Sequence, residues 1–227
     1  MQILIQQDRS SLRPAYRIDL PRAHFVAESK RFLSHAKIIV KDSETNIIAS
    51  IKRKFTFFKI NYDINIGFKK YKLLTKTFWK PTYLCSGDLA RYEIIEHNKL
   101  KYSIFQERAQ IGAFVKKRVS IGAADIYELF ADNDADHLLF VCIVLALDNA
   151  TNDGTYSASV TVDYGRLFGE LKPFDENWRP KWVSEVGPSA GHRGRPYFLK
   201  SLVSLTGCYD TYDANGNVTT KETANLR

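Results

Sequence analysis

The chain has 227 residues, 44% hydrophobic and 13% aromatic, which suits one good-sized domain with an appendage and argues against wholesale disorder. Its net charge of +8 arises within residues 1–150, which carry 24 Lys and Arg against 16 Asp and Glu, whereas residues 151–227 carry 9 of each. Basic domains meet acidic partners such as nucleic acid, anionic lipid or acidic proteins, and a merely soluble basic surface is the alternative.

The spacing of the cysteines and the hydropathy of the chain narrow the class of protein further. Cys85, Cys142 and Cys208 lie far apart and form no CxxC pair, which argues against a zinc site or a disulfide scaffold and predicts buried or incidental thiols. We expect no metal and no cofactor. No apolar segment is long enough for a signal peptide or a transmembrane span, so we expect a cytoplasmic protein, with peripheral attachment to a membrane left open.

From Ala23 to Phe130 the sequence is rich in aromatic and β-branched residues that alternate with polar ones, which is typical of half-buried strands. The alternation is clearest in Phe55–Ile64. Short strands at about ten-residue spacing indicate a sandwich or a barrel. The expected strands are Phe32–Val40, Asn46–Lys52, Phe55–Ile64, Ile66–Lys76, Lys80–Cys85, Ala90–Glu96, Leu100–Glu107, Gln110–Lys117 and Ala124–Phe130.

A single helix is expected at Asp136–Asp148, where every residue between His137 and Asp148 is apolar. Such a helix is buried on all sides or lies in a membrane, and about 16 Å of rise is too short to span a bilayer. A lone helix without a polar face, placed after many strands, favours a closed barrel with the helix inside. The acidic residues Asp132, Asp134 and Asp136 suit the N-terminal end of this helix, where the helix dipole favours negative charge.

After residue 150 the composition changes, because glycine and proline interrupt the chain repeatedly. We therefore divide the chain into a barrel domain at 1–150 and a partly ordered extension at 151–227, which packs aromatic side chains on the barrel. Ala214–Asn217 is a turn signal that would close a small hairpin within Tyr209–Thr219. A frayed end is expected at Lys221–Arg227.

The hairpin sequence Ile48-Ala49-Ser50-Ile51-Lys52 and the helix ending Leu145-Ala146-Leu147-Asp148 carry a family resemblance. Over about residues 15–150 the chain resembles the superfamily of LURP-one-related proteins, tubby C-terminal domains and phospholipid scramblases, and it is most similar to the LURP-one-related branch. The resemblance implies a mainly β fold, a closed antiparallel barrel of about twelve strands around a central hydrophobic helix. It also implies lipid association, since tubby-like domains bind phosphoinositide headgroups through basic residues. Asp132, Asp134 and Asp136 occupy a place comparable to the calcium-binding segment before the helix of scramblases, so calcium binding is the alternative to helix capping for them.

The candidate functional residues form a basic run between residues 52 and 80, which holds nine cations and one acid, Asp63. Alternating lysines can share one face of a sheet and attract an anionic leaflet, with Phe78 and Trp79 dipping into its interface. Lys116–Arg118 could join them in space. A solvated strand exterior is the alternative. The candidate anion-binding or lipid-binding residues are Lys52, Arg53, Lys54, Lys69, Lys70, Lys72, Lys76 and Lys80.

Other function classes fit less well. Aromatic residues between lysines in Phe55–Tyr71 could stack nucleic-acid bases, but a barrel needs those rings inside, so nucleic acid is not favoured. The five histidines show no metalloprotease spacing, and neither a GxSxG nor a P-loop motif occurs. We expect a binding protein without catalytic residues. The hypothesis from a second class is a structural or protein-interaction module that uses the C-terminal extension to bind a partner protein.

Overall fold

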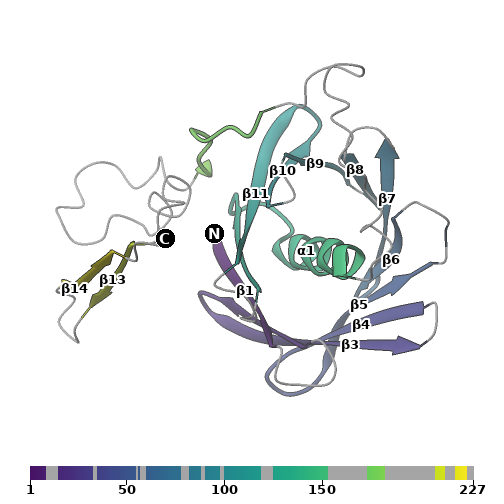
Figure 1. Cartoon of the computed structure of the whole chain (residues 1–227). Coiled ribbons are helices and arrows are strands. Elements are labelled where there is room, and N and C mark those ends of the chain that lie inside the picture. The colour runs from purple at the N-terminus through teal and green to yellow at the C-terminus, as the bar shows by residue number, and fades with distance from the viewer. Residues whose placement is uncertain are drawn as a thin grey trace. The chain divides into compact units, whose positions relative to one another are not determined.

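The computed structural model describes residues 1–8, 15–32, 35–54, 56, 60–77, 82–87, 90–97, 100–118, 125–152, 173–181, 208–212 and 218–223. The chain divides into two compact units, Met1–Glu185 and Val186–Arg227. The first unit is a closed antiparallel barrel in which each strand pairs with its neighbours in sequence and β1 pairs with β12 (Figure 1). Its strands are β1 (Gln2–Asp8), β2 (Ala15–Leu20), β3 (Ala23–Phe32), β4 (His35–Lys41), β5 (Ile47–Arg53), β6 (Asn61–Ile66), β7 (Lys69–Thr77), β8 (Thr82–Gly87), β9 (Arg91–Glu96), β10 (Lys101–Gln106), β11 (Ala109–Arg118) and β12 (Asp125–Ala131).

The predicted fold class is confirmed, because the barrel has twelve strands and surrounds a helix. The strand expected at Phe32–Val40 starts later, since Phe32 ends β3 and β4 begins at His35. Three strands, β1 to β3, were not predicted. β1 buries three side chains and β2 buries two, at least as many as the predicted strands β6 and β8, so a local signal was present there. The signal of β3 is weaker, because it turns the small residues Ala27 and Ser29 inward.

The first strand closes the barrel. Ile3 of β1 pairs with Leu129 of β12, and Ile5 pairs with Ile18 of β2, so the first and last strands of the barrel become neighbours. All four side chains are completely buried. Closure leaves no unpaired strand edge in the barrel, which removes the usual route to edge-to-edge aggregation.

The helix α1 (His137–Asn152) lies inside the ring of strands (Figure 1). Every side chain from Leu139 to Ala146 is fully buried, as the apolar sequence predicts. Asp136 caps the helix, because its Oδ1 accepts a hydrogen bond from the Leu139 N–H at 3.1 Å. The helix continues four residues past the expected end at Asp148, since Asp148 and Asn149 find polar partners inside the barrel.

The turns joining β2 to β3, β4 to β5, β6 to β7 and β10 to β11 lie at one end of the barrel, because neighbouring strands are antiparallel. β12 also ends there, so the helix begins at the same end. We call it the tight-turn end. Its described turns are Pro21–Arg22, Asp42–Asn46, Gly67–Phe68 and Glu107–Arg108.

The second unit contains an antiparallel hairpin of β13 (Cys208–Tyr212) and β14 (Val218–Thr223) (Figure 1). The predicted hairpin is therefore present, while its expected turn at Ala214–Asn217 lies outside the described residues. β14 continues through Lys221 to Thr223, which are the first three residues of the stretch expected to be frayed.

Candidate anion-binding site

A row of basic side chains crosses the outer wall of the barrel. Cross-strand pairs join seven residues from β3 to β9, five of them cations and one an acid, and the five cations are all exposed. Their neighbours along each strand, such as Ile38, Ile51 and Ile64, are buried, which shows that the row faces outward. In order, the row is Lys30, Lys37, Lys52, Asp63, Lys72, Ser86 and Arg91.

A depression of about 540 Å³ lies on this wall around the row's centre. Lysine ammonium groups, the Asn65 amide and the Ser86 hydroxyl supply hydrogen-bond donors. Gly87 is required by packing, because a Cβ atom there would lie 2.5 Å from the Tyr71 ring and 2.8 Å from the Lys70 carbonyl oxygen. The lining residues are Asp63, Asn65, Lys70, Tyr71, Lys72, Ser86 and Gly87.

Tyr71 connects this wall to the central helix. Its hydroxyl donates a hydrogen bond to Asp136 Oδ2 at 3.2 Å. Burial, and next the negative charge of Asp136, raise the pKa of Tyr71 to about 12, so the phenol stays protonated and remains a donor at neutral pH. Tyr71 therefore both lines the depression and binds Asp136, the residue that caps the helix.

Three of the eight predicted residues lie in or beside the depression without an acidic ion-pair partner. Lys70 and Lys72 line the depression, and Lys52 pairs in register with the lining residue Asp63. Lys52, Lys70 and Lys72 are exposed, and none of them forms an ion pair with any described residue. Lys70 and Lys72 are two residues apart on β7, roughly 7 Å, and Lys52 lies two strands from Lys72, about 9.6 Å. We call these three residues the lysine triad.

Two other predicted lysines are exposed, but each forms an ion pair with an acidic side chain. Lys54 Nζ lies 2.8 Å from Asp63 Oδ2, and Lys76 Nζ lies 2.8 Å from Glu93 Oε1. The first pair matters for the triad, because it compensates the charge of the one acid that lies among the three lysines. Exposed pairs of this kind add little to stability.

The remaining predicted residues lie elsewhere. Lys69 sits at the tight-turn end, with its Nζ 3.4 Å from Asp136 Oδ2. Arg53 pairs in register with Tyr62, whose side chain is buried inside the barrel, so Arg53 does not follow the outward row. Lys80 lies outside the described residues, together with Phe78 and Trp79.

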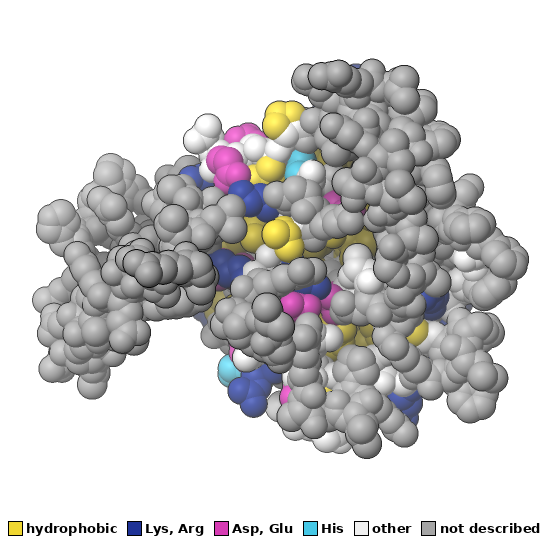
Figure 2. All heavy atoms as spheres, in the orientation of Figure 1, with side chains coloured by type: hydrophobic (Ala, Val, Ile, Leu, Met, Phe, Trp, Pro, Cys, Tyr) yellow, Lys and Arg dark blue, Asp and Glu magenta, His cyan; other side chains and the backbone are white. Residues whose placement is uncertain are grey.

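Lys116 and Lys117 of the basic run do not join the triad, contrary to expectation, and the Arg118 side chain lies outside the described part of the chain. Lys116 is buried, with its Nζ 2.9 Å from Asp125 Oδ2 and 3.0 Å from Asp148 Oδ1. Lys117 pairs with Glu128 at 2.7 Å. On the face shown in Figure 2, the Lys and Arg side chains of the described residues form separate patches with acidic side chains between them.

A buried polar network surrounds the C-terminal part of the helix, and the sequence did not predict it. Asp148, whose side chain is fully buried, accepts hydrogen bonds from the Tyr16 hydroxyl at 2.7 Å, from the Tyr127 hydroxyl and from Lys116. The Lys116 ammonium also lies over the Tyr127 ring, 5.2 Å from its centroid. These contacts anchor the helix to β2, β11 and β12, and we assign them a structural role.

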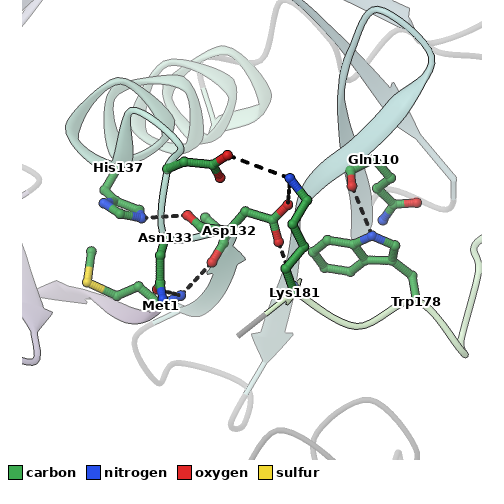
Figure 3. A network of polar contacts seen from close by, with 9 residues as sticks. Met1, Gln110, Asp132, Asn133, His137, Trp178 and Lys181 are labelled. Atoms are coloured by element: carbon green, nitrogen blue, oxygen red, sulfur yellow. Dashed lines mark hydrogen bonds and ion pairs between the residues drawn. The ribbon is translucent and has the colours of Figure 1, made fainter. Parts of the chain in front are cut away.

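A second polar network fastens the segment Pro173–Lys181 to the barrel (Figure 3). Asp132, which has a buried side chain, accepts a hydrogen bond from the Lys181 backbone N–H at 2.8 Å, and the Trp178 indole N–H donates to the Gln110 carbonyl at 3.1 Å. Asp132 therefore serves this segment and does not cap the helix. Asp134 lies 3.6 Å from the Lys181 ammonium and is mostly exposed.

Asp132→Ala is expected to loosen Pro173–Lys181 while the barrel stays folded. A hydrogen bond to a charged group contributes about 1.5–3 kcal/mol, so local opening should rise at least about 10-fold. Limited trypsin digestion after Lys181 would measure this, because cleavage follows the population of the open form. Asp134→Ala is the control. Equal cleavage rates in the two variants would contradict the assigned role of Asp132.

A metal site, a reactive thiol and a membrane-spanning helix find little support in the described part of the chain. No three His, Cys, Asp or Glu side chains there lie close enough together to hold a metal ion. Cys85 and Cys142 are buried free thiols, and burial raises the pKa of Cys85 to about 12, which leaves that thiol unreactive at neutral pH. Within the described residues, none of the helices has the length and apolar content that crossing a bilayer requires.

Comparisons of the chain with protein-family models, with curated proteins and with solved structures found no match. The barrel around a helix agrees with the fold that the tubby-like resemblance implies. Membership of that superfamily stays a prediction.

Proposed function

We propose that this protein binds a phosphate-bearing anionic partner through the lysine triad, with a phosphoinositide-containing membrane surface as the first candidate. The observation that carries the proposal is the position of Lys52, Lys70 and Lys72. Lys70 and Lys72 line one depression of about 540 Å³, and Lys52 lies beside it, paired in register with the lining residue Asp63. All three lysines are exposed, and none forms an ion pair with a described residue.

The donor set favours phosphate over a single carboxylate. Three lysines whose backbone positions are spaced by roughly 7 and 9.6 Å can each direct an ammonium group to a different phosphate group of one headgroup. The Asn65 amide and the Ser86 hydroxyl add neutral donors between them. The site lies on an outer wall and not in an enclosed cavity, which suits a headgroup presented by a surface. The resemblance to tubby-like domains supports the same proposal.

Lys70→Glu/Lys72→Glu is expected to abolish most binding to vesicles of phosphatidylcholine containing a phosphatidylinositol bisphosphate. Each lysine near an anionic leaflet contributes about 1 kcal/mol, so removing two charges weakens binding about 30-fold, and reversing them weakens it further. Cosedimentation at low salt measures the change. Both side chains are exposed, so folding should be unaffected.

The matched control is Arg17→Glu/Arg108→Glu, which changes the net charge equally at two exposed positions away from β5 to β8. It should retain most of the binding. If the two double variants lost binding equally, net charge and not the lysine triad would be responsible. If wild-type protein did not bind the vesicles at all, the membrane proposal would be wrong.

The alternative function is a protein-interaction module. It is favoured by the division of the chain, because Val186–Arg227 forms a compact unit of its own with the hairpin β13–β14. Removal of residues 186–227 should then abolish capture of a partner protein while vesicle binding persists. Loss of vesicle binding on that removal would count against a separate role for this unit.

A further inference from the structure

We infer that the tight-turn end of the barrel inserts into the lipid along β3 to β7, with Phe68 as its apolar anchor. This inference rests on the proposed function and deepens it, because it states which edge of the barrel enters the membrane and how the lysine triad is presented to the headgroups.

The exposed apolar side chains gather at this end. Among the described residues, the large hydrophobic side chains that are exposed are Val26 at 46%, Ile47 at 64% and Phe68 at 105%. Val26 and Ile47 both pair in register with Lys41, on either side of it. Phe68 lies in the two-residue turn between β6 and β7, beyond the pair Ile66 and Lys69, and β6 is the strand next to β5. The three residues thus border one sector of the rim.

Folding does not account for Phe68. Gly67, with a φ of 55°, supplies the left-handed residue that the tight turn needs. Phe68 is completely exposed, so its ring buries no apolar surface, and a polar residue would serve the turn equally well. A single exposed apolar residue is ordinary, whereas three on one rim together with lysines point to a surface that they contact.

Charge complementarity identifies that surface as anionic lipid. Lys69 and Lys70 follow Phe68 directly, and Lys41 lies between Val26 and Ile47. An aromatic tip flanked by lysines is the pattern of proteins that lie in a membrane interface, where rings enter about 5–10 Å. Along β7, Lys70 lies roughly 7 Å from Phe68 and Lys72 roughly 13 Å, so insertion of Phe68 places the triad near the phosphate level.

Acidic groups at this end lie in and beside the β4–β5 turn and at the start of the helix, where Asp136 Oδ2 lies 3.4 Å from the Lys69 ammonium. Asp42 accepts hydrogen bonds from the backbone N–H groups of Glu44 and Asn46 within the β4–β5 turn. Glu28 lies 3.0 Å from the Lys41 ammonium, and Glu44 is exposed. The β6–β7 turn, which carries Phe68, has two lysines after it and no acid, so it is the part of the rim best suited to approach an anionic surface.

The test compares Phe68→Ser with Phe68→Leu on the full chain. With the vesicles described above, Phe68→Ser should bind at least about 10-fold more weakly than wild type, and Phe68→Leu should bind nearly as well. Binding of soluble inositol trisphosphate, measured by calorimetry, should be the same for all three proteins, because Phe68 does not line the depression. In Phe68→Trp, brominated lipid should quench fluorescence more than it does in wild type.

The outcomes separate the two proposals. If Phe68→Ser binds vesicles like wild type while Lys70→Glu/Lys72→Glu does not, the insertion proposal is overturned and the proposed function stands. If wild type binds neither vesicles nor inositol trisphosphate, both are overturned. If Phe68→Ser only abolishes self-association in analytical ultracentrifugation, the rim contacts a second copy of the chain and not lipid.

Discussion

Val144→Asp is expected to leave the whole barrel unfolded under conditions in which the wild-type protein is folded. Val144 lies in the middle of α1 and is completely buried against strands on all sides. A carboxylate there would lack a cation of its own, because the Lys116 ammonium one turn away already pairs with Asp125 and Asp148. An unpaired buried charge costs several kcal/mol or more. Since whole domains are stable by only about 5–15 kcal/mol, one such residue can prevent folding. Leu139→Asp should act in the same way.

Circular dichroism in the far ultraviolet, followed during heating, measures this effect. Val144→Ala is the control at the same site, and it should fold with a lower melting temperature because it only leaves a cavity. Phe68→Asp is the control for the aspartate itself, since that position is completely exposed and should tolerate the charge. A cooperative melt of Val144→Asp near the wild-type temperature would show that the helix is not the centre of the core.

Asp148→Ala is expected to destabilise the protein by about 3–5 kcal/mol, the cost of removing one partner from a buried ion pair. The substitution leaves the Tyr16 and Tyr127 hydroxyls without their acceptor and the Lys116 ammonium with Asp125 as its ion-pair partner. Asp148→Asn should lose less stability than Asp148→Ala, because the amide oxygen can still accept a hydrogen bond although the charge is gone.

Denaturant unfolding of the two Asp148 variants measures these free energies. The comparison is Asp63→Ala, which removes the partner of Lys54 from a pair that is 30% and 48% exposed, and which should cost about 1 kcal/mol or less. Equal losses in Asp148→Ala and Asp63→Ala would mean that the network inside the barrel does not anchor the helix.

Most of the fold could be predicted because two signals are local. Strands such as β6 and β9 alternate buried and outward residues, and α1 is apolar around its whole circumference, which requires an enclosing layer. Strands β1 and β2 were missed although they match or exceed the predicted strands β6 and β8 in length and in the number of buried side chains. Their place in the barrel depends on pairing with β12, which lies more than a hundred residues away.

The candidate site could be predicted in composition but not in arrangement. The excess of lysine between residues 52 and 80 is visible in the sequence, whereas the pairing of Lys54 with Asp63 and of Lys76 with Glu93 depends on the register of four strands. Register also adds Lys30, Lys37 and Arg91 to the row. Sequence distance hides the role of Lys116, because Asp148, which it meets inside the barrel, lies 32 residues away.

The most direct test of the lysine triad is nuclear magnetic resonance of lysine side chains labelled by reductive ¹³C-methylation, with signals assigned by single Lys→Arg variants. During titration with inositol trisphosphate, the signals of Lys52, Lys70 and Lys72 should shift together and saturate at one concentration, because Lys70 and Lys72 line one depression and Lys52 lies beside it, in register with Asp63 and Lys72. The signal of Lys117, which is paired with Glu128, should stay in place. Shifts confined to lysines outside the triad, or equal small shifts of all lysines, would contradict a binding site on this wall.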